Sequence, residues 1–273
     1  MTEVRAMYFS ATGTTKKIVR FIADRIAELG GFSRVDTDFT LPAGRAVPPA
    51  IRRDEIVVFG VPVYAGRVPN VLLKYLATVR GDATPAVPVV LYGNRNYDDG
   101  LIELRNILEG NGFITFAAAA FIGEHSFSRI LAAGRPDDED IRIAGIFAGG
   151  AYNKYLICGA DDLPHPVSVK GCDPIRPYYT PRDRAGVPVN ILKVKPKVDP
   201  EKCVRCGHCA AVCPMGSIDP DDVTQYTGIC IKCGACEKGC PMGARYFDDP
   251  GYVYHRTELE LGYERRAEPD LFL

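Results

Sequence analysis

The sequence has no apolar run long enough to cross a lipid bilayer. Its first apolar stretch is interrupted by Glu3 and Arg5, so we expect no secretory signal peptide and a cytoplasmic location. The formal net charge is -1, which gives no reason to expect a nucleic-acid partner. No cysteine precedes Cys158, whereas a secreted disulfide scaffold would spread its cysteines through the chain. These absences favour a protein without a membrane span in a reducing compartment.

Eight of the ten cysteines lie close together and form an internal repeat. The pattern Cys-x2-Cys-x2-Cys-x3-Cys-Pro begins at Cys203 and begins again 27 residues later at Cys230. Three cysteines separated by two residues each can wrap a loop around three corners of an iron–sulfur cube, and the cysteine before the proline serves the second cube. The spacing therefore predicts two 4Fe–4S clusters with crossed ligand sets. One set is Cys203, Cys206, Cys209 and Cys240, and the other is Cys230, Cys233, Cys236 and Cys213.

Zinc is the alternative occupant of these cysteines, because eight thiolates could also make two all-thiolate sites of four ligands each. Zinc sites usually show pairs of cysteines two residues apart, and a longer loop separates one pair from the next. A cysteine triplet followed by Cys-Pro, found twice, matches that pattern poorly. The repeat therefore favours iron–sulfur clusters over zinc.

The first part of the chain alternates strand-like runs with stretches of helical spacing. Strands are predicted over 4–9, 32–38, 55–61, 87–92 and 113–121, and helices over 14–29, 68–79, 100–108 and 137–156. Strands that alternate with helices imply a parallel sheet covered on both faces. Because crossovers are right-handed, the simplest arrangement is a doubly wound five-stranded sheet of order 2-1-3-4-5.

A hydroxyl-rich turn lies between the first strand and the first helix. Backbone N–H groups and the helix dipole at such a turn suit a phosphate, and the hydroxyls add donors. The turn lacks the Gly-Lys-Ser/Thr ending of a Walker loop and is not Gly-x-Gly-x-x-Gly, so a dinucleotide is less expected. The candidate phosphate-binding residues are Ser10, Thr12, Gly13, Thr14 and Thr15.

Two later loops follow the third and fourth predicted strands and would meet the first loop at the carboxyl edge of the sheet. That edge is where FMN binds in a sheet of this order. Tyr64 and Tyr97 could stack on a flavin, although each could instead be a rim residue of the sheet. His125, after the fifth strand, could approach the flavin or cap its own loop. The candidate residues of the two loops are Pro62, Tyr64, Ala65, Gly66, Arg67, Gly93, Asn94, Arg95 and Tyr97.

The layout resembles the flavodoxin–ferredoxin fusion family, often called ferrodoxins. The Tyr-Gly-Asn-Arg-x-Tyr-Asp-Asp run at 92–99 and the Gly-Arg-Pro-Asp run at 134–137 look typical of it. Thr14 stands where many relatives have Asn, and a threonine can still donate to phosphate. The resemblance implies a flavodoxin-like α/β domain that binds FMN and a small α+β ferredoxin domain that binds two 4Fe–4S clusters.

Four segments follow from these patterns. We expect the FMN-binding domain over 1–158, a proline-rich connector over 159–196, and the ferredoxin domain over 197–247. The tail over 248–273 is expected to pack back on the body of the protein.

The expected function is electron transfer between FMN, the two clusters and a redox partner protein, in an anaerobic metabolism. Flavin can exchange one or two electrons, whereas iron–sulfur clusters exchange one at a time. The alternative is a flavin-dependent reductase that acts on a small molecule at FMN and receives its electrons through the clusters. The sequence shows no acid–base pair and no nucleophilic triad, so it names no catalytic residue. Transfer inside one chain and transfer across a homodimer both fit the sequence.

Overall fold

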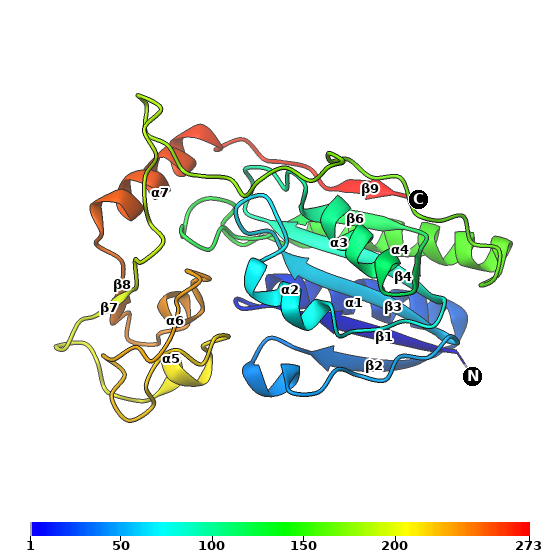
Figure 1. The fold of residues 1–273 in the computed structure, drawn as a ribbon, viewed down its shortest axis with the longest axis horizontal. Helices are drawn as coiled ribbons and strands as arrows, with labels where there is room; N and C mark the ends of the chain where they lie inside the picture. Colours follow the sequence, from blue (N-terminus) through cyan, green and yellow to red (C-terminus); the bar gives the residue numbers. More distant parts are fainter. Residues whose placement is uncertain (1) are drawn as a thin grey trace.

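The computed structural model describes residues 2–273, and its main element is a seven-stranded sheet. Five parallel strands follow the order β2-β1-β3-β4-β6, which confirms the predicted flavodoxin-like arrangement (Figure 1). Two further strands, β5 and β9, extend this sheet. The parallel strands are β1 (Glu3–Tyr8), β2 (Ser33–Asp38), β3 (Glu55–Pro62), β4 (Thr84–Tyr92) and β6 (Ala118–Ile122).

The predicted strand over 113–121 is wrong in one respect, because two strands replace it. Both β5 (Phe113–Thr115) and β6 pair with β4 in parallel. Ala86 of β4 pairs with Thr115, and Val89 of β4 pairs with Ala119. Between these two pairs, the segment that joins β5 to β6 has one residue more than β4. An extra residue interrupts a ladder, and Pro88 has no N–H to donate at this point.

Four helices cover the two faces of the sheet, and a separate apolar cluster fills each face. Helix α1 begins at the phosphate-type turn, and it ends at Gly31, whose left-handed backbone (φ 62°) lets its N–H reach the carbonyls of Ala27 and Glu28. Pro69 precedes α2, which is shorter than the predicted 68–79. The helices on one face are α1 (Thr14–Gly30) and α4 (Asp138–Cys158), and those on the other are α2 (Asn70–Leu76) and α3 (Gly100–Gly110).

The chain after α4 first follows an irregular course over 159–196 and then forms the cysteine-rich part. Small elements surround the cysteines there, and a longer helix leads the chain back to the sheet, as Figure 1 shows. The last strand pairs antiparallel with β6, so the C-terminal tail closes one edge of the main sheet. The elements are β7 (Lys197–Val198), α5 (His208–Ala211), α6 (Ala235–Lys238), β8 (Arg245–Tyr246), α7 (Pro250–Gly262) and β9 (Asp270–Phe272).

Within residues 2–273, no helix combines the length and the apolar character that crossing a bilayer requires. The short 3-10 helix η1 (Pro42–Arg45) lies in the proline-containing loop after β2. Arg45 in this turn donates to the carbonyl of Pro214, which connects the sheet domain to the cysteine-rich part.

Candidate functional site

The eight repeat cysteines line two cavities, four to a cavity. We call the four that lie nearer the sheet domain the inner set and the other four the outer set. The grouping is that of the crossed sets derived from the repeat, and a role as cluster ligands stays a prediction. The inner set is Cys213, Cys230, Cys233 and Cys236, and the outer set is Cys203, Cys206, Cys209 and Cys240.

The same backbone features recur around both sets. Four residues after the last cysteine of each repeat, an N–H points at its sulfur: Ser217 reaches Cys213 Sγ at 3.4 Å, and Ala244 reaches Cys240 Sγ at 3.3 Å. Such bonds favour an anionic sulfur, and donors to sulfur are a means of tuning iron–sulfur clusters. Both cysteine loops therefore supply backbone N–H donors that stabilise a thiolate sulfur.

Burial acts against free thiolates in the inner set. It raises the pKa of the Cys233 and Cys236 thiols to about 12, so both would hold their protons at neutral pH without a positive centre. A bound metal centre deprotonates a thiol outright. Within residues 2–273, no group of three or more His, Cys, Asp or Glu side chains is arranged to hold a single metal ion. The cysteines line the two cavities instead, and this placement fits a cluster in each.

The predicted phosphate loop opens onto a cavity with a volume of ≈ 640 Å³, the largest of those described here. Thr12, Gly13 and Thr14 line it at the start of α1. Gly13 has φ 89°, a left-handed conformation that favours glycine. Ser10 serves the loop itself, because its Oγ accepts from the Lys16 N–H at 2.9 Å. The volume lies within the range of about 300–1,000 Å³ that is usual for small-molecule sites.

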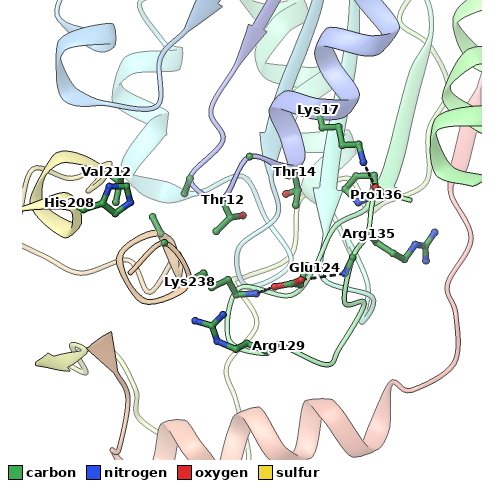
Figure 2. Close-up of a pocket in the computed structure, with 15 residues that line it drawn as sticks. Thr12, Thr14, Lys17, Glu124, Arg129, Arg135, Pro136, His208, Val212 and Lys238 are labelled. Atoms are coloured by element: carbon green, nitrogen blue, oxygen red, sulfur yellow. Dashed lines mark hydrogen bonds and ion pairs between the residues drawn. The ribbon is translucent and has the colours of Figure 1, made fainter. Parts of the chain in front are cut away.

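Charged side chains surround this cavity (Figure 2). Lys17 Nζ donates to the Pro136 carbonyl at 2.6 Å, and Arg129 points from the loop after β6. Lys238 comes from α6 of the second repeat and pairs with Glu124. With the positive end of α1, these groups make the cavity suitable for an anion.

Two smaller cavities continue from the first along the carboxyl edge of the sheet. The middle one shares Thr12, Thr14 and Glu124 with the largest cavity. The far one has a volume of ≈ 220 Å³. The middle and far cavities share residues at or just after the ends of β3, β4 and β6, namely Val63, Tyr64, Tyr92, Gly93, His125 and Ser126.

Most of the predicted loop residues line this row of cavities. Thr15 and Pro62 line the middle cavity, and Ala65, Gly66 and Arg95 line the far one. The Arg95 guanidinium lies 4.4 Å from the ring centroid of Tyr179, so the connector covers this end of the row.

Four predicted residues do not line any of the three cavities described here, namely Ser10, Arg67, Asn94 and Tyr97. Tyr97 donates its hydroxyl to Asp270 at 2.7 Å, and Asn94 donates to the carbonyls of Tyr263 and Arg265 at 2.7 Å each. Arg67 pairs with Glu103, as its bond at 2.6 Å shows. The polar groups of Tyr97, Asn94 and Arg67, which were expected to contact a flavin, form hydrogen bonds with the C-terminal tail and with α3 instead.

Other lining residues carried no signal in the sequence. They come from the connector, the second cysteine repeat and α7, which have no periodicity that points to the edge of the sheet. These residues reach the edge of the sheet only in the folded chain, so the sequence alone could not identify them. They are Tyr179, Pro181, Ile191, Leu192, Ile231, Lys232, His255 and Leu259.

The inner set of cysteines meets the row of cavities within one chain. Cys233 lines both its own cysteine cavity and the middle cavity. Tyr64 stands at the same place: burial is the main cause that raises the pKa of its hydroxyl well above the usual range, and the nearby Cys233 and Cys230 raise it further. The side chain of Tyr64 lines the middle and far cavities, so one aromatic residue lies between the loops of the sheet and the inner cysteines.

Comparisons with known proteins find matches to two segments of the cysteine-rich part. Residues 195–218 and 227–243 each match a family model described as a 4Fe-4S binding domain. A search of curated proteins gives no match.

Solved flavodoxin structures are similar to the first part of the chain. A flavodoxin from Streptococcus pneumoniae TIGR4 is 17% identical, with 56% of this chain and 99% of that chain covered and a TM-score of 0.38. Oxidised flavodoxin 1 from Bacillus cereus is 16% identical, with 57% and 99% covered and a TM-score of 0.40. A flavodoxin from the domain Archaea is 12% identical, with 57% and 99% covered and a TM-score of 0.39.

Proposed function

We propose that this chain, in which a flavodoxin-like sheet precedes two segments that match 4Fe-4S binding domains, is an electron carrier. It would hold FMN along the carboxyl edge of the sheet and one 4Fe–4S cluster in each cysteine-lined cavity, and exchange electrons with a redox partner protein. The observation that carries the proposal is Cys233, which lines both a cysteine cavity and the row of cavities at the sheet edge. We also propose a cytoplasmic location in an anaerobic metabolism, because the ligand thiols have to stay reduced.

The start of α1 would hold the phosphate end of FMN. Thr12 and Thr14 offer hydroxyls there, and the helix contributes the positive end of its dipole. Lys17 adds a full positive charge on the next turn of the helix. These groups fix one end of the ligand and so orient the rest of it along the row of cavities.

The loops after β3, β4 and β6 would enclose the ring system. Tyr64 and the backbone at Gly93 lie at the junction of the middle and far cavities. Connector residues, among them Tyr179 and Ile191, cover the far cavity and exclude water from it. When bound, FMN would supply exchange of one or two electrons and the clusters exchange of single electrons.

The two cysteine sets have different access to solvent, and this difference gives the transfer a direction. Cys233 of the inner set is 8% exposed, and its loop packs on the sheet domain. Cys206 of the outer set is exposed. The inner set therefore faces the proposed FMN site, and the outer set faces a partner protein.

The test is anaerobic purification of the full chain, followed by counts of iron, acid-labile sulfide and FMN. We expect about eight irons and about eight sulfides for two 4Fe–4S clusters, with one FMN per chain. A reduced ferredoxin should then reduce the bound flavin. Colourless protein that contains zinc in place of iron would overturn the proposal.

A flavin-dependent reductase is the second candidate, and the ≈ 640 Å³ cavity favours it. That cavity extends from the phosphate loop to Arg129 and His208, so it reaches past the residues expected to touch FMN. Steady turnover of NADH with a small anionic acceptor, in the absence of any partner protein, would favour the reductase over the carrier.

A further inference from the structure

The two cysteine repeats differ at one buried position. Ile218 and Arg245 are equivalent in the 27-residue repeat, since each lies five residues after the cysteine that precedes proline. Each is 4% exposed. Ile218 lines the inner cysteine cavity, and Arg245 lines the outer one. The same place in the fold therefore holds an apolar side chain beside one cysteine set and a cation beside the other.

The guanidinium of Arg245 touches a sulfur of the outer set. Its Nη2 donates to Cys209 Sγ at 3.1 Å and also to the Val223 carbonyl. Its Nη1 donates to the Tyr226 hydroxyl at 2.9 Å. These three bonds fix the charged group, so it has one orientation toward the outer set.

No carboxylate among the described residues forms an ion pair with Arg245, whereas both of the other buried arginines among residues 2–273 have one. Arg5 pairs with Glu55, and Arg135 pairs with Asp140. A buried charge without a partner of opposite sign is strongly unfavourable. The anion that compensates Arg245 would then be Cys209 together with the other thiolates and the cluster of the outer set.

Among residues 2–273, no cationic side chain donates a hydrogen bond to a sulfur of the inner set. The Cys230 sulfur accepts from the backbone N–H of Lys232 at 3.4 Å. The Lys232 ammonium itself donates to two carbonyls, those of Cys230 and Leu192, at 3.1 and 3.2 Å. A cation that is bonded directly to a ligand sulfur stabilises the more negative, reduced state of a cluster, and so raises its reduction potential.

We propose that Arg245 is a positioning residue that holds the outer cluster at a higher reduction potential than it would otherwise have, so that an electron passing from the inner site collects at the outer site. The inference rests on the proposed function, since it requires a cluster in each cavity. In the transfer, one electron leaves the inner site and one enters the outer site, and no bond is made or broken. The exposed outer set then carries the electron that a partner protein takes.

The experiment is a potentiometric titration of the anaerobically purified full chain, followed by electron paramagnetic resonance. The main variant is Arg245→Ile, which copies Ile218 of the inner half. We expect a change of at least tenfold in the equilibrium that distributes an electron between the two sites, equal to about 59 mV for a one-electron couple. The potential of the outer cluster should fall by more than that of the inner cluster, because Arg245 is bonded to Cys209 whereas its charge acts on Cys236 of the inner set without a bond.

Three variants separate charge from structure. Arg245→Lys keeps a cation and should retain most of the wild-type potential, whereas Arg245→Gln keeps a donor without the charge and should behave like Arg245→Ile. Ile218→Val is the matched control in the inner half and should leave both potentials unchanged. Loss of iron from both neutral variants but not from Arg245→Lys would also support the need for a cation.

Two results would overturn the inference, and neither bears on the proposed function. One is a pair of unchanged potentials in Arg245→Ile at full iron and sulfide content. The other is loss of iron from Arg245→Lys as well as from the neutral variants, which would make Arg245 a structural residue. By contrast, wild-type protein without iron, or with a single one-electron couple besides the flavin, would contradict the proposed function itself.

Discussion

The two cysteine repeats have the same spacing and the same local backbone, yet their surroundings differ. Arg205 and Lys232 occupy equivalent places, and both have φ 53°, a left-handed conformation that is uncommon outside glycine. The loops around the two cysteine sets are therefore built in the same way. Cys206 is nevertheless exposed, whereas its equivalent Cys233 is buried. The cysteine pattern determines the local fold of both loops. Contact with the sheet domain determines which group of four cysteines is the inner one.

The glycines of the repeats show where that contact lies. Gly207 and Gly234 precede α5 and α6, with φ 74° and 80°. A Cβ added at Gly207 would meet nothing within 4 Å, whereas one added at Gly234 would lie 2.6 Å from the Ser126 carbonyl oxygen. The second repeat thus lies directly against the loop after β6. The two halves of a nearly symmetric sequence therefore differ in their contact with the loop after β6.

The largest effect should come from removing the cysteine before each proline. Cys213→Ala and Cys240→Ala should each lose about four of the eight irons, because each removes one ligand of one cluster. The crossed sets predict that Cys213→Ala empties the inner site, although Cys213 belongs to the first repeat. Iron counts and the rate at which reduced ferredoxin reduces the flavin are the measurements.

The two variants should differ in their flavin chemistry. Cys240→Ala keeps the inner cluster beside the flavin, and so should keep any rapid exchange between them. Cys213→Ala should lose it. Equal slowing of flavin reduction in both variants would show that the inner set is not the neighbour of the flavin.

The next effect concerns the ion pair that docks the second repeat. Lys238 pairs with Glu124, and its ammonium also donates to the carbonyls of His125 and Ser128 at 2.7 and 2.6 Å. Lys238→Met leaves these acceptors without their donor, which should lower the free energy of unfolding by about 2–3 kcal/mol. Urea unfolding gives the size of the change, and hydrogen exchange of 124–129 gives its place.

Lys202→Met, directly before the first repeat, is the matched control. Lys202 pairs with Asp199 at 2.9 Å but is mostly exposed, so its loss should cost no more than about 0.5 kcal/mol. If both lysine variants lowered stability equally, the Lys238 contact would not be the one that docks the repeat.

A smaller difference should separate two glycine variants. Gly207→Ala and Gly234→Ala both place a Cβ in the left-handed region, which costs about 1–2 kcal/mol in each. Only Gly234→Ala also brings that Cβ against the Ser126 backbone, and the clash should add about 1–2 kcal/mol. The comparison of the two unfolding free energies cancels the shared cost of the backbone conformation.

Equal unfolding free energies for Gly207→Ala and Gly234→Ala would mean that the loop after β6 can move away from Gly234 without loss of stability. Protection of the 124–129 amides from hydrogen exchange should therefore fall in Gly234→Ala and stay at the wild-type level in Gly207→Ala.

The sequence was sufficient for the features that short spacings determine. The strand order, the crossed grouping of cysteines and the hydroxyl-rich turn all depend on local patterns, and each is present in the structure. The partners of Tyr97 and Asn94 could not be read in this way, because Asp270 and Arg265 lie about 170 residues further along the chain. A polar residue on a loop is equally suited to a ligand and to a returning tail, so the pattern alone did not decide between them.

The difference in burial between the two cysteine sets could not be read from the sequence for a related reason. The two repeats have nearly the same spacing, and burial depends on which of them touches the loop after β6. That contact joins Lys238 to Glu124, more than a hundred residues apart. In the sequence, this contact is marked by two charged residues of the second repeat, Glu237 and Lys238, which stand where the first repeat has Ala210 and Ala211.

The smallest expected effect is a pH dependence confined to the inner side. Burial lowers the pKa of His125 to about 3, with the charges of Lys238, His255 and Arg95 as further causes. An unfolded histidine takes up a proton below about pH 6.5, while folded His125 stays neutral until about pH 3. The folded state should therefore lose stability as the pH falls from about 6.5, by about 1 kcal/mol at pH 5.5. Above pH 7 this histidine should contribute no pH dependence.

Two histidine variants test whether His125 causes this pH dependence of stability. One replaces the partly buried His125, and the other replaces the exposed His208. His125→Gln should reduce the decline between pH 6.5 and 5.5, a window above the usual pKa of most carboxylates. The part that remains is expected from His255, because burial lowers its pKa as well. His208→Gln in the exposed first repeat should keep the wild-type slope, because its side chain lies at the surface. Urea unfolding at half-unit steps of pH measures both slopes. The opposite result would be a loss of stability at low pH that His208→Gln removes and His125→Gln leaves unchanged. It would place the pH-sensitive contact beside the outer cysteine set, and so contradict the difference in burial argued for the two repeats.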